Sequence, residues 1–397
     1  MKRQTLTIGL FLIAVSAGLI GALSTSAQRQ ATVAQSQNPI PANYTLSGPY
    51  THENLTIFLL HGVDQSRGPA PLTLQEAMKQ KKVVVRETGD VNELTIQNRS
   101  NQEVFVQAGD IVKGGQQDRV LALDLIVPPR SGRIPIEAFC VEQGRWSRRG
   151  QEAVAAFSAS NNMLASKELK IAAKAKGSQG EVWANVSKAQ AKLAENVVVA
   201  DSAPATARAR RGAAPAAGLG LGQARAADLS SAGERIEAAG ATGLTAPSVV
   251  SAASPSSLQL TLENKLVKDT ANDYVKKLSS IIAGKRDVIG FVFAINGQLN
   301  SADVYSSNAL FAKLWPKMLE ASAVEAIAEF KADGQFEPVK KEEAQAFLLA
   351  AQDGKTETKK VLARTSVVKS ETGKSLFFET RDGRRSDGWV HRNYLAK

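Results

Sequence analysis

Short apolar runs rich in β-branched residues recur through the first half of the chain, separated by residues typical of tight turns. Such runs predict β-strands, and the Gly, Pro, Asn and Asp between them favour sharp connections. Thr73–Lys82, which begins after Pro71, predicts a short helix among the strands. The predicted strands are Leu55–Leu60, Val83–Arg86, Glu93–Gln97, Val104–Gln107, Val120–Val127 and Arg133–Val141.

The hydrophobic period changes beyond Gly150, where alanine-rich stretches predict helices from Asn162 to Lys174 and from Ser178 onward. Ser178 and Glu181 have the spacing of a capping box, which satisfies backbone N–H groups at the start of a helix. The apolar residues that then share one helical face are Val182, Val186, Ala189 and Leu193. This helix is therefore expected to pack through a single stripe.

Residues 197–258 consist mainly of Ala, Gly, Ser, Pro and Arg, with few large apolar side chains. Such a segment buries too little apolar surface to offset the entropy of ordering its backbone. We therefore predict a disordered, low-complexity insertion at 197–258. It separates a first part at residues 44–196 from a second part of the same domain at residues 259–397.

The second part alternates helices and strands. Asn296–Gly297 between alternating apolar residues is a strong signal for a two-residue hairpin turn. Pro316 is expected to kink or break the helix that starts after Ser306 or Ser307. Other predicted elements are helices at Tyr274–Ile282 and Glu342–Gln352, and strands at Thr365–Val368, Ser375–Thr380 and Trp389–Tyr394. The predicted fold class is α+β: a β-rich N-terminal half, helices, the insertion, and a mixed C-terminal part that completes the unit.

The N-terminus has the pattern of a secretory signal peptide over residues 1–27, followed by a linker at 28–43. Lys2 and Arg3 precede an apolar stretch from Ile8 to Leu23, and small residues end at Ala27. The apolar stretch is shorter than the roughly 20 residues that a membrane-spanning helix needs, which favours cleavage over an uncleaved anchor. We expect an exported, periplasmic or secreted protein with no transmembrane helix in its mature chain.

Composition excludes several classes of protein. Cys140 is the only cysteine among 397 residues, so no internal disulfide forms, and three histidines are too few for a typical zinc site. The net charge of +11 is spread along the chain, without an aromatic-bearing RNA motif or zinc-finger spacing. We therefore expect no nucleic acid partner and no metal, while an anionic polymer or small molecule suits the charge. No cofactor is indicated.

Two dense polar clusters interrupt the predicted strands between Glu103 and Trp146. One lies between two strand-like runs and the other closes the next strand, so a shared site requires strand pairing to bring them together. The candidate ligand-binding residues are Lys113, Gly114, Gly115, Gln116, Gln117, Asp118 and Arg119 in the first cluster, and Glu142, Arg145 and Trp146 in the second.

The chemistry of these clusters suits an anion. The Gly114–Gly115 amides can form a backbone concavity, to which Lys113 and Arg119 add positive charge. Arg145 can fork onto a carboxylate or phosphate, and Trp146 can stack on a base or sugar ring. The alternatives are a solvated hairpin loop and internal ion pairs, for which Asp118, Asp124 and Glu142 are available.

Catalytic interpretations also exist. Cys140 could act as a nucleophile with His61 or His391 as its base, or it could be a buried, inert thiol. Asp124 lies in a strand that is apolar on both faces, so its carboxylate must find a partner. Carboxylates available for acid–base chemistry are Asp110, Asp118, Glu142 and Asp303, of which Asp110 is equally a turn residue and Asp303 an exposed strand residue.

Five separate motifs occur in an order typical of one bacterial family. They are Asn92–Leu94, Gly114–Arg119, Glu142–Trp146, Gln179–Trp183 and Leu314–Lys317. On these motifs the chain resembles the domain named for its association with ADP-ribosylglycohydrolases and the rhodanese-phosphatase superfamily. The resemblance implies a genomic link to enzymes that handle ADP-ribose and related nucleotides. It supplies no catalytic residues.

The sequence thus predicts a non-catalytic binding module for an anionic small molecule or polymer, related by family context to ADP-ribose or nucleotides. One alternative is a hydrolase acting on a phosphate- or ribose-bearing substrate, in which two of Asp110, Asp118 and Glu142 converge with Arg119 in a pocket. Another is a structural envelope protein, in which the two polar clusters lie apart and internal salt bridges account for the arginines.

Overall fold

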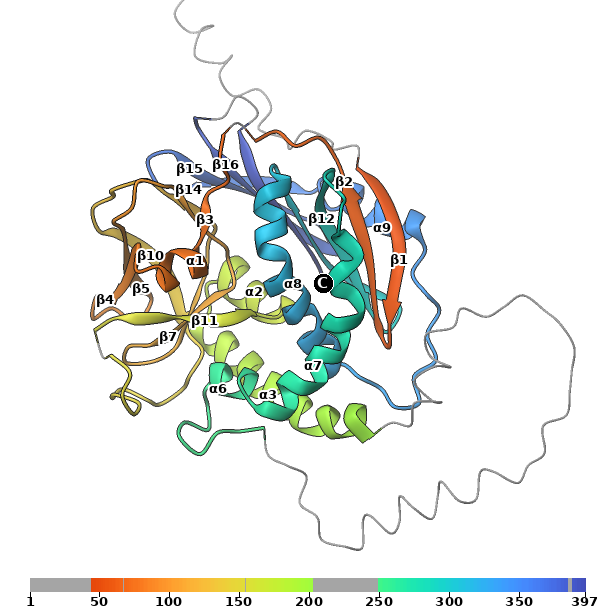
Figure 1. Cartoon of the computed structure of the whole chain (residues 1–397), viewed down its shortest axis with the longest axis horizontal. Helices are drawn as coiled ribbons and strands as arrows, with labels where there is room; N and C mark the ends of the chain where they lie inside the picture. Colours follow the sequence, from red (N-terminus) through yellow and green to blue (C-terminus); the bar gives the residue numbers. More distant parts are fainter. Residues whose placement is uncertain (1–43, 67, 154, 203–248, 385–387) are drawn as a thin grey trace, which may run out of the picture. The chain divides into compact units, whose positions relative to one another are not determined.

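The computed structural model describes residues 44–66, 68–153, 155–202, 249–384 and 388–397 (Figure 1). The predicted signal peptide, the linker and most of the predicted insertion lie outside these ranges. Strands dominate the first half of the described chain, helices follow them, and the C-terminal part is mixed, which confirms the predicted α+β class. Among the described residues, no helix combines the length and the apolar content needed to cross a membrane.

The largest sheet in the described part of the chain joins its two ends. Its eight antiparallel strands run in the order β1-β2-β12-β13-β17-β16-β15-β14. Because β2 pairs with β12, residues far apart in sequence form one sheet, and the C-terminal part completes the unit as predicted. The strands are β1 (Thr45–His52), β2 (Leu55–His61), β12 (Val288–Ile295), β13 (Gln298–Tyr305), β14 (Lys355–Lys360), β15 (Thr365–Glu371), β16 (Ser375–Asp382) and β17 (Trp389–Ala396).

A second β-rich region is built from residues 72–164. Six strands pair in the order β11-β7-β8-β10-β5-β4, and three more in the order β3-β6-β9. Val85, Ile96, Val112 and Ala138 share its apolar core. The strands are β3 (Leu72–Thr73), β4 (Val83–Glu87), β5 (Glu93–Asn98), β6 (Val104–Val106), β7 (Asp110–Gly114), β8 (Arg119–Leu121), β9 (Leu125–Val127), β10 (Ile134–Cys140) and β11 (Phe157–Leu164).

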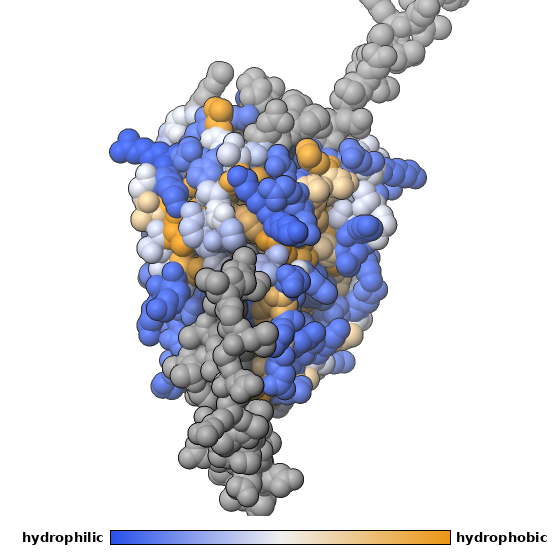
Figure 2. Space-filling model, turned by 90° about the vertical axis from the view of Figure 1, so that its right-hand side faces the viewer, coloured by the Kyte–Doolittle hydropathy of each residue, from blue (hydrophilic) through white to orange (hydrophobic). Residues whose placement is uncertain are grey.

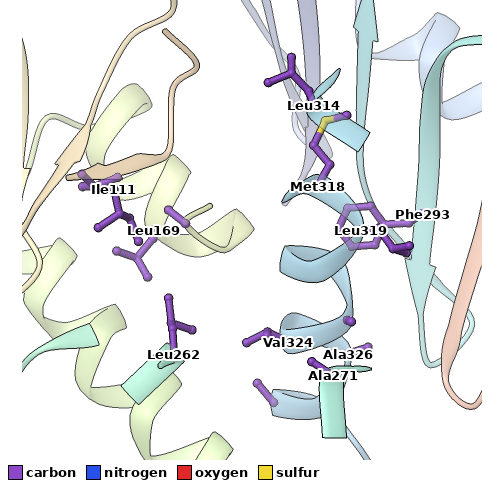
Figure 3. Close-up of a cluster of buried hydrophobic side chains, with 14 of the residues drawn as sticks. Ile111, Leu169, Leu262, Ala271, Phe293, Leu314, Met318, Leu319, Val324 and Ala326 are labelled. Atoms are coloured by element: carbon purple, nitrogen blue, oxygen red, sulfur yellow. The ribbon is translucent and has the colours of Figure 1, made fainter. Parts of the chain in front are cut away.

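Helices cover both faces of the eight-stranded sheet. On one face α8 packs on β12, with Leu319 beside Phe293, while Leu169 and Leu262 face Val324 of α8 (Figure 3). On the other face α9 packs through Leu348. The helices are α1 (Leu74–Lys79), α2 (Lys167–Lys170), a π-helical turn (Ile171–Ala175), α3 (Gln179–Ser202), α6 (Leu258–Leu262), α7 (Lys265–Leu278), a 3-10 turn (Ser279–Ile282), α8 (Asn308–Ala328) and α9 (Lys341–Ala350).

Hydrophilic side chains cover most of the described surface visible in Figure 2, and apolar side chains appear there in small separate patches. Such scattered exposure is ordinary for folded proteins. Charged residues lie at this surface and also, as shown below, in buried clusters.

Several predicted elements differ from the structure. The predicted single strand Val120–Val127 is two strands: β8 pairs with β10, whereas β9 pairs with β6 in another sheet. Residues 162–164, at the start of the helix predicted from Asn162 to Lys174, belong instead to strand β11 (Phe157–Leu164). Of the kink or break predicted at Pro316, the break does not occur, because α8 continues through Pro316 with Trp315 and Met318 buried.

The predicted insertion also differs at both of its ends. Helix α3 continues to Ser202, with Val197 buried in the main core. After residue 248 the chain returns with Val249 buried in the same core. Apolar side chains thus hold both flanks of the segment in place.

Candidate functional site

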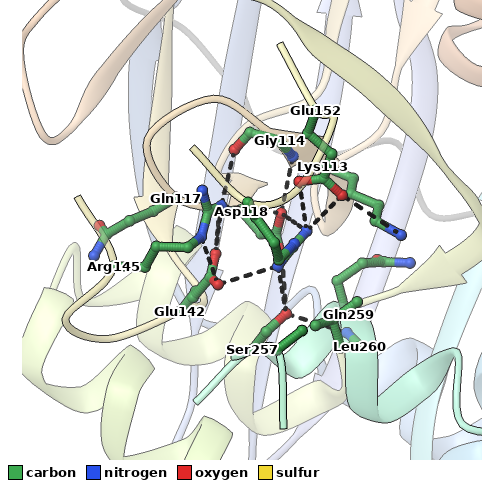
Figure 4. Close-up of polar contacts among 12 residues, drawn as sticks. Lys113, Gly114, Gln117, Asp118, Glu142, Arg145, Glu152, Ser257, Gln259 and Leu260 are labelled. Carbon is green, nitrogen blue, oxygen red and sulfur yellow. Dashed lines mark hydrogen bonds and ion pairs between the residues drawn. The ribbon is translucent and has the colours of Figure 1, made fainter. Parts of the chain in front are cut away.

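The two predicted polar clusters lie together. Residues 114–119 connect β7 to β8, and residues 141–150 follow β10, which pairs with β8. The Asp118 N–H donates to Glu142 Oε2 (3.0 Å), and Arg145 Nη2 lies 2.6 Å from the same oxygen. Figure 4 shows Asp118 between Glu142, Arg145 and Ser257. Strand pairing therefore produces the convergence that a shared site requires.

Arg149 is the strongest link in this cluster. Its two terminal nitrogens each lie 2.9 Å from an oxygen of Asp118, and Nη1 lies 3.1 Å from Glu142. Burial is the largest single effect on the pKa of Arg149 and lowers it, but the hydrogen bonds and charges of Asp118, Glu152 and Glu142 together outweigh burial and leave that pKa above its usual value. The sequence prediction did not include Arg149. Its spacing of four from Arg145 was the available signal.

Arg145 is likewise held inside the protein. Its Nε donates to Glu142 Oε1 (2.7 Å), and its terminal nitrogens donate to the carbonyls of Gly114 (3.2 Å) and Gly115 (3.1 Å). Burial is the largest single effect on the pKa of Glu142 and raises it, but hydrogen bonds from Arg145, Ser254 and the Asp118 N–H, together with the charge of Arg145, outweigh burial and leave the pKa below its usual value. The two buried carboxylates, Asp118 and Glu142, are thus each paired with both arginines.

The glycine loop does bind anions, but they are the protein's own carboxylates. The Gly114 N–H donates to Asp118 Oδ1 (2.9 Å) and the Gln116 N–H to Glu87 Oε1 (2.8 Å). A Cβ on Gly115 would lie 2.4 Å from Glu87 Oε1, so this close approach requires glycine. The predicted backbone concavity is therefore filled from within.

The remaining candidates divide between the interior and the surface. Arg119 is buried and donates to the Gln117 carbonyl (2.7 Å), with Glu87 at 3.7 Å. Gln117 is also buried. Lys113 Nζ lies 2.5 Å from Glu263. Trp146 differs from them all, because 53% of its surface is exposed.

A second charged cluster lies at the centre of the molecule. Both ring nitrogens of His391 face carboxylates, Asp124 at 3.0 Å and Asp303 at 3.0 Å, which only the doubly protonated ring satisfies. Burial lowers the pKa of His391, but Asp124 and Asp303 outweigh burial and raise it. Asp303 is buried, so its predicted exposure is wrong: β13 lies inside the sheet.

Asp124 finds the partner that its apolar strand demands. Besides His391 it accepts hydrogen bonds from Thr380 (2.7 Å), Lys174 (3.3 Å) and the Ala108 N–H (2.6 Å). Burial raises the pKa of Asp124, but Lys174 and then His391 outweigh burial and hold it well below its usual value. The cluster is enclosed, which suits a structural crosslink between the β-rich region and the large sheet.

An open cavity lies beside this cluster, between α1, β11 and α8. Its volume is about 730 Å³, within the range of small-molecule sites. Lys79, Lys313 and Lys317 line it together with one carboxylate, Glu76, so positive charge predominates. Apolar surface in the cavity comes from Met78, Val83, Phe157 and Pro316.

The three lysines of the cavity differ in how they are held. Lys313 donates to the Pro71 carbonyl (3.3 Å) and to Glu76 (3.3 Å). Lys317 is buried with its Nζ 2.6 Å from Asp110 Oδ1, and Lys79 is exposed. The sequence prediction missed this set. The signal was the pair Lys313 and Lys317, one helical turn apart around Pro316.

Two other interpretations of the sequence can be compared with the structure. Cys140 is a buried thiol whose pKa burial raises to about 11, which keeps it protonated and inert at neutral pH. Asp110 lies with Lys317 rather than with Asp118 and Glu142. Within the ranges described, no group of three or more His, Cys, Asp or Glu side chains is arranged to hold a metal ion.

The comparisons with known proteins give one result. No curated protein and no solved structure matches the chain. One family model matches residues 43–395, which includes both polar clusters and the lysine-lined cavity. The chain therefore belongs to the family of the ARG and Rhodanese-Phosphatase-superfamily-associated Protein domain.

Proposed function

We propose that this protein recognises an anionic small molecule, and that the molecule binds in the cavity lined by Lys79, Lys313 and Lys317. The observation that carries the proposal is the excess of lysines over carboxylates in a cavity of about 730 Å³. Apolar side chains in the same cavity suit the uncharged part of a ligand, as in other small-molecule sites.

The proposed site differs from the one that the sequence predicts, which consists of the two polar clusters. Arg145 and Arg149 already neutralise Asp118 and Glu142, so an external anion would have to displace buried carboxylates. Lys79 is exposed, and the bonds of Lys313 are long and partly exposed, so they are weak competitors of a ligand.

Family context selects the first ligand to try. The family name records an association with ADP-ribosylglycohydrolases, and ADP-ribose carries two phosphates together with apolar and polar ring faces. We propose ADP-ribose or a related phosphate-bearing nucleotide as the ligand class. An exported protein would meet such a molecule outside the cytoplasm, and the export itself remains part of the proposal.

Calorimetric titration with ADP-ribose tests the proposal. Wild-type protein is expected to release heat with a saturable isotherm. Lys313→Gln removes one charged hydrogen bond donor, so binding should weaken by about tenfold to a hundredfold. Arg148→Gln is the matched control, since Arg148 is an exposed cation two residues after Trp146.

The outcomes separate the two locations. Weakening by Lys313→Gln alone supports the cavity. Weaker binding in Arg148→Gln alone would place the ligand at the surface around Trp146 and would contradict binding in the cavity. Absence of binding to ADP-ribose and to adenine nucleotides by the wild-type protein would overturn recognition of this ligand class.

A further inference from the structure

Lys317 belongs both to the cavity wall and to the buried interior. Its side chain lines the cavity, while its ammonium lies 2.6 Å from Asp110 Oδ1 and the two side chains are 3% and 2% exposed. An ammonium has three N–H donors, and Asp110 accepts one of them. An anion in the cavity that uses the remaining donors therefore competes with Asp110 for the charge of the ammonium.

Asp110 itself is fixed. Its second oxygen accepts a hydrogen bond from the Gln107 N–H (3.0 Å), and its own N–H donates to the Gln107 carbonyl (3.0 Å). Asp110 is also the first residue of β7, which pairs with β8 and β11. The carboxylate therefore stays in place when a ligand binds, and the ammonium is attracted by both anions.

We propose that Asp110 is an internal competitor that makes the cavity selective for a ligand with two negative charges, such as a phosphate monoester dianion or the diphosphate of ADP-ribose, over a monoanion. This inference rests on the proposed function. Coulomb attraction scales with charge, so a monoanion offers Lys317 no more than Asp110 already does, whereas a phosphate dianion offers about twice as much. Glu76 holds Lys313 in the same way at the cavity mouth, through a longer and more exposed contact.

Titration with phenyl phosphate and benzenesulfonate at pH 8 tests this selectivity. Phenyl phosphate is a dianion there, since the second pKa of a phosphate monoester is about 6. The wild-type protein is expected to bind phenyl phosphate about tenfold more tightly than benzenesulfonate. Asp110→Asn removes the charge that competes for Lys317, so benzenesulfonate should bind about tenfold more tightly and the affinity ratio of phenyl phosphate to benzenesulfonate should fall. Asp110→Glu keeps the charge and should restore the wild-type affinity ratio.

Controls separate selectivity from stability. Asp124→Asn also breaks a buried lysine pair, but Asp124 lies outside the cavity lining, so the affinity ratio should stay at the wild-type value. If Asp110→Asn does not fold, the double variant Asp110→Asn/Lys317→Gln, which leaves no buried charge at this pair, decides. It should bind phenyl phosphate at least tenfold more weakly than wild type.

Two failures are distinguishable. Binding of neither probe by a wild-type protein that also fails to bind ADP-ribose contradicts the proposed function, whereas binding of ADP-ribose but of neither probe overturns the role of Asp110 alone. Binding of both probes with equal affinity, or a ratio unchanged in Asp110→Asn, overturns the role of Asp110 and leaves anion recognition standing. Wild-type affinity for phenyl phosphate in the double variant overturns it as well.

Discussion

Arg148 and Arg149 are neighbours in the chain but lie in opposite environments. Arg149 is buried against Asp118, Glu142 and Glu152, whereas Arg148 is exposed and donates to Gln151. A buried ion depends on its partners because the protein, rather than water, must compensate its charge. An exposed ion is screened by solvent and contributes little to stability. The pair therefore separates structural charge from surface charge.

Arg149→Ala is expected to lower the free energy of unfolding by about 3–5 kcal/mol, because Asp118 and Glu142 lose a buried partner. Arg148→Ala should change it by less than about 0.5 kcal/mol. Urea denaturation of the three proteins measures both effects. Equal effects of the two substitutions would show that the ion network does not hold the two polar clusters together.

Glu325 provides a pH-dependent prediction. Burial, followed by the Glu168 carboxylate, raises the pKa of Glu325 from 4.5 to about 7. The folded protein holds this proton more tightly than the unfolded chain, so the stability it contributes is full below pH 4.5 and is lost as pH rises through about 7.

Glu325→Gln should therefore stabilise the protein at pH 8 by on the order of 1–3 kcal/mol and have little effect at pH 4. The amide can still accept the hydrogen bond that Asn300 donates to Glu325. Thermal unfolding at both pH values checks this, with the exposed Glu342→Gln as control. A stabilisation independent of pH would contradict the assignment.

For single residues, the sequence predicted that a buried charge needs a partner, but it did not identify the partner. The two apolar faces around Asp124 required that its carboxylate be paired. Its actual partners, Thr380 and His391, lie 256 and 267 positions away, and no local pattern contains that information. Cys140 and Trp146 needed only their neighbours, and the expectation of a buried thiol agrees with the structure.

Local elements follow local rules where a turn or cap sets them. Asn296 and Gly297 both have positive φ (51° and 72°), as the predicted two-residue hairpin requires. Ser307 caps α8 and Ser178 accepts a hydrogen bond from the Glu181 N–H at the start of α3, also as predicted. These signals act over a few residues and need no tertiary contact.

Two glycine substitutions should have opposite effects on stability. A Cβ on Gly297 would lie 2.4 Å from the Glu337 carbonyl, whereas a Cβ on Gly180, inside α3, would meet nothing within 4 Å. Gly297→Ala is expected to cost at least about 1 kcal/mol, and Gly180→Ala to stabilise by about 0.5–1 kcal/mol. Chemical denaturation of both variants tests this. A gain from Gly297→Ala would contradict the described hairpin.

The elements that the sequence mispredicted are those decided by distant packing. β8 and β9 are separate because Ala122–Asp124 carry the chain from one sheet to another. β11 forms because β7 offers it an antiparallel partner, which outweighs the helical pattern predicted from Asn162 onward. α8 continues through Pro316 because burial of its flanking residues offsets the lost backbone hydrogen bond.

At the scale of the molecule, the eight-stranded sheet joins residues 45–61 to residues 288–396. The cluster of Asp124, His391 and Asp303 then ties this sheet to the β-rich region. Both arrangements link sequence-distant segments, so the two parts are expected to unfold together. The motif order predicted the family, but the topology came only from the structure.

Asp124→Asn tests this coupling. It leaves Lys174 and His391 without their buried carboxylate and should destabilise the protein by roughly 3 kcal/mol or more. Hydrogen exchange should show faster exchange in both β10 and β16, in one cooperative unit. Exposed Asp353→Asn is the control. Faster exchange confined to one sheet would show that the cluster does not couple them.

The sequence predicted the chemistry of the candidate site, which is recognition of an anion, but not its location in the fold. Convergence of the clusters at Gly114–Arg119 and Glu142–Trp146 follows from strand pairing, as expected. That their charges would cancel internally depended on Arg149 and Ser257, the latter from far along the chain. The cavity required α1, β11 and α8 to meet, which no sequence pattern specifies.

The most direct test of anion recognition is a lysine-modification footprint of the wild-type protein, read by mass spectrometry with and without ADP-ribose. Acetylation of Lys79 and Lys313 should slow when ADP-ribose is present, while acetylation of exposed Lys355 and Lys374 should not change. Unchanged acetylation of Lys79 and Lys313 at a concentration of ADP-ribose that saturates binding would contradict the proposed site.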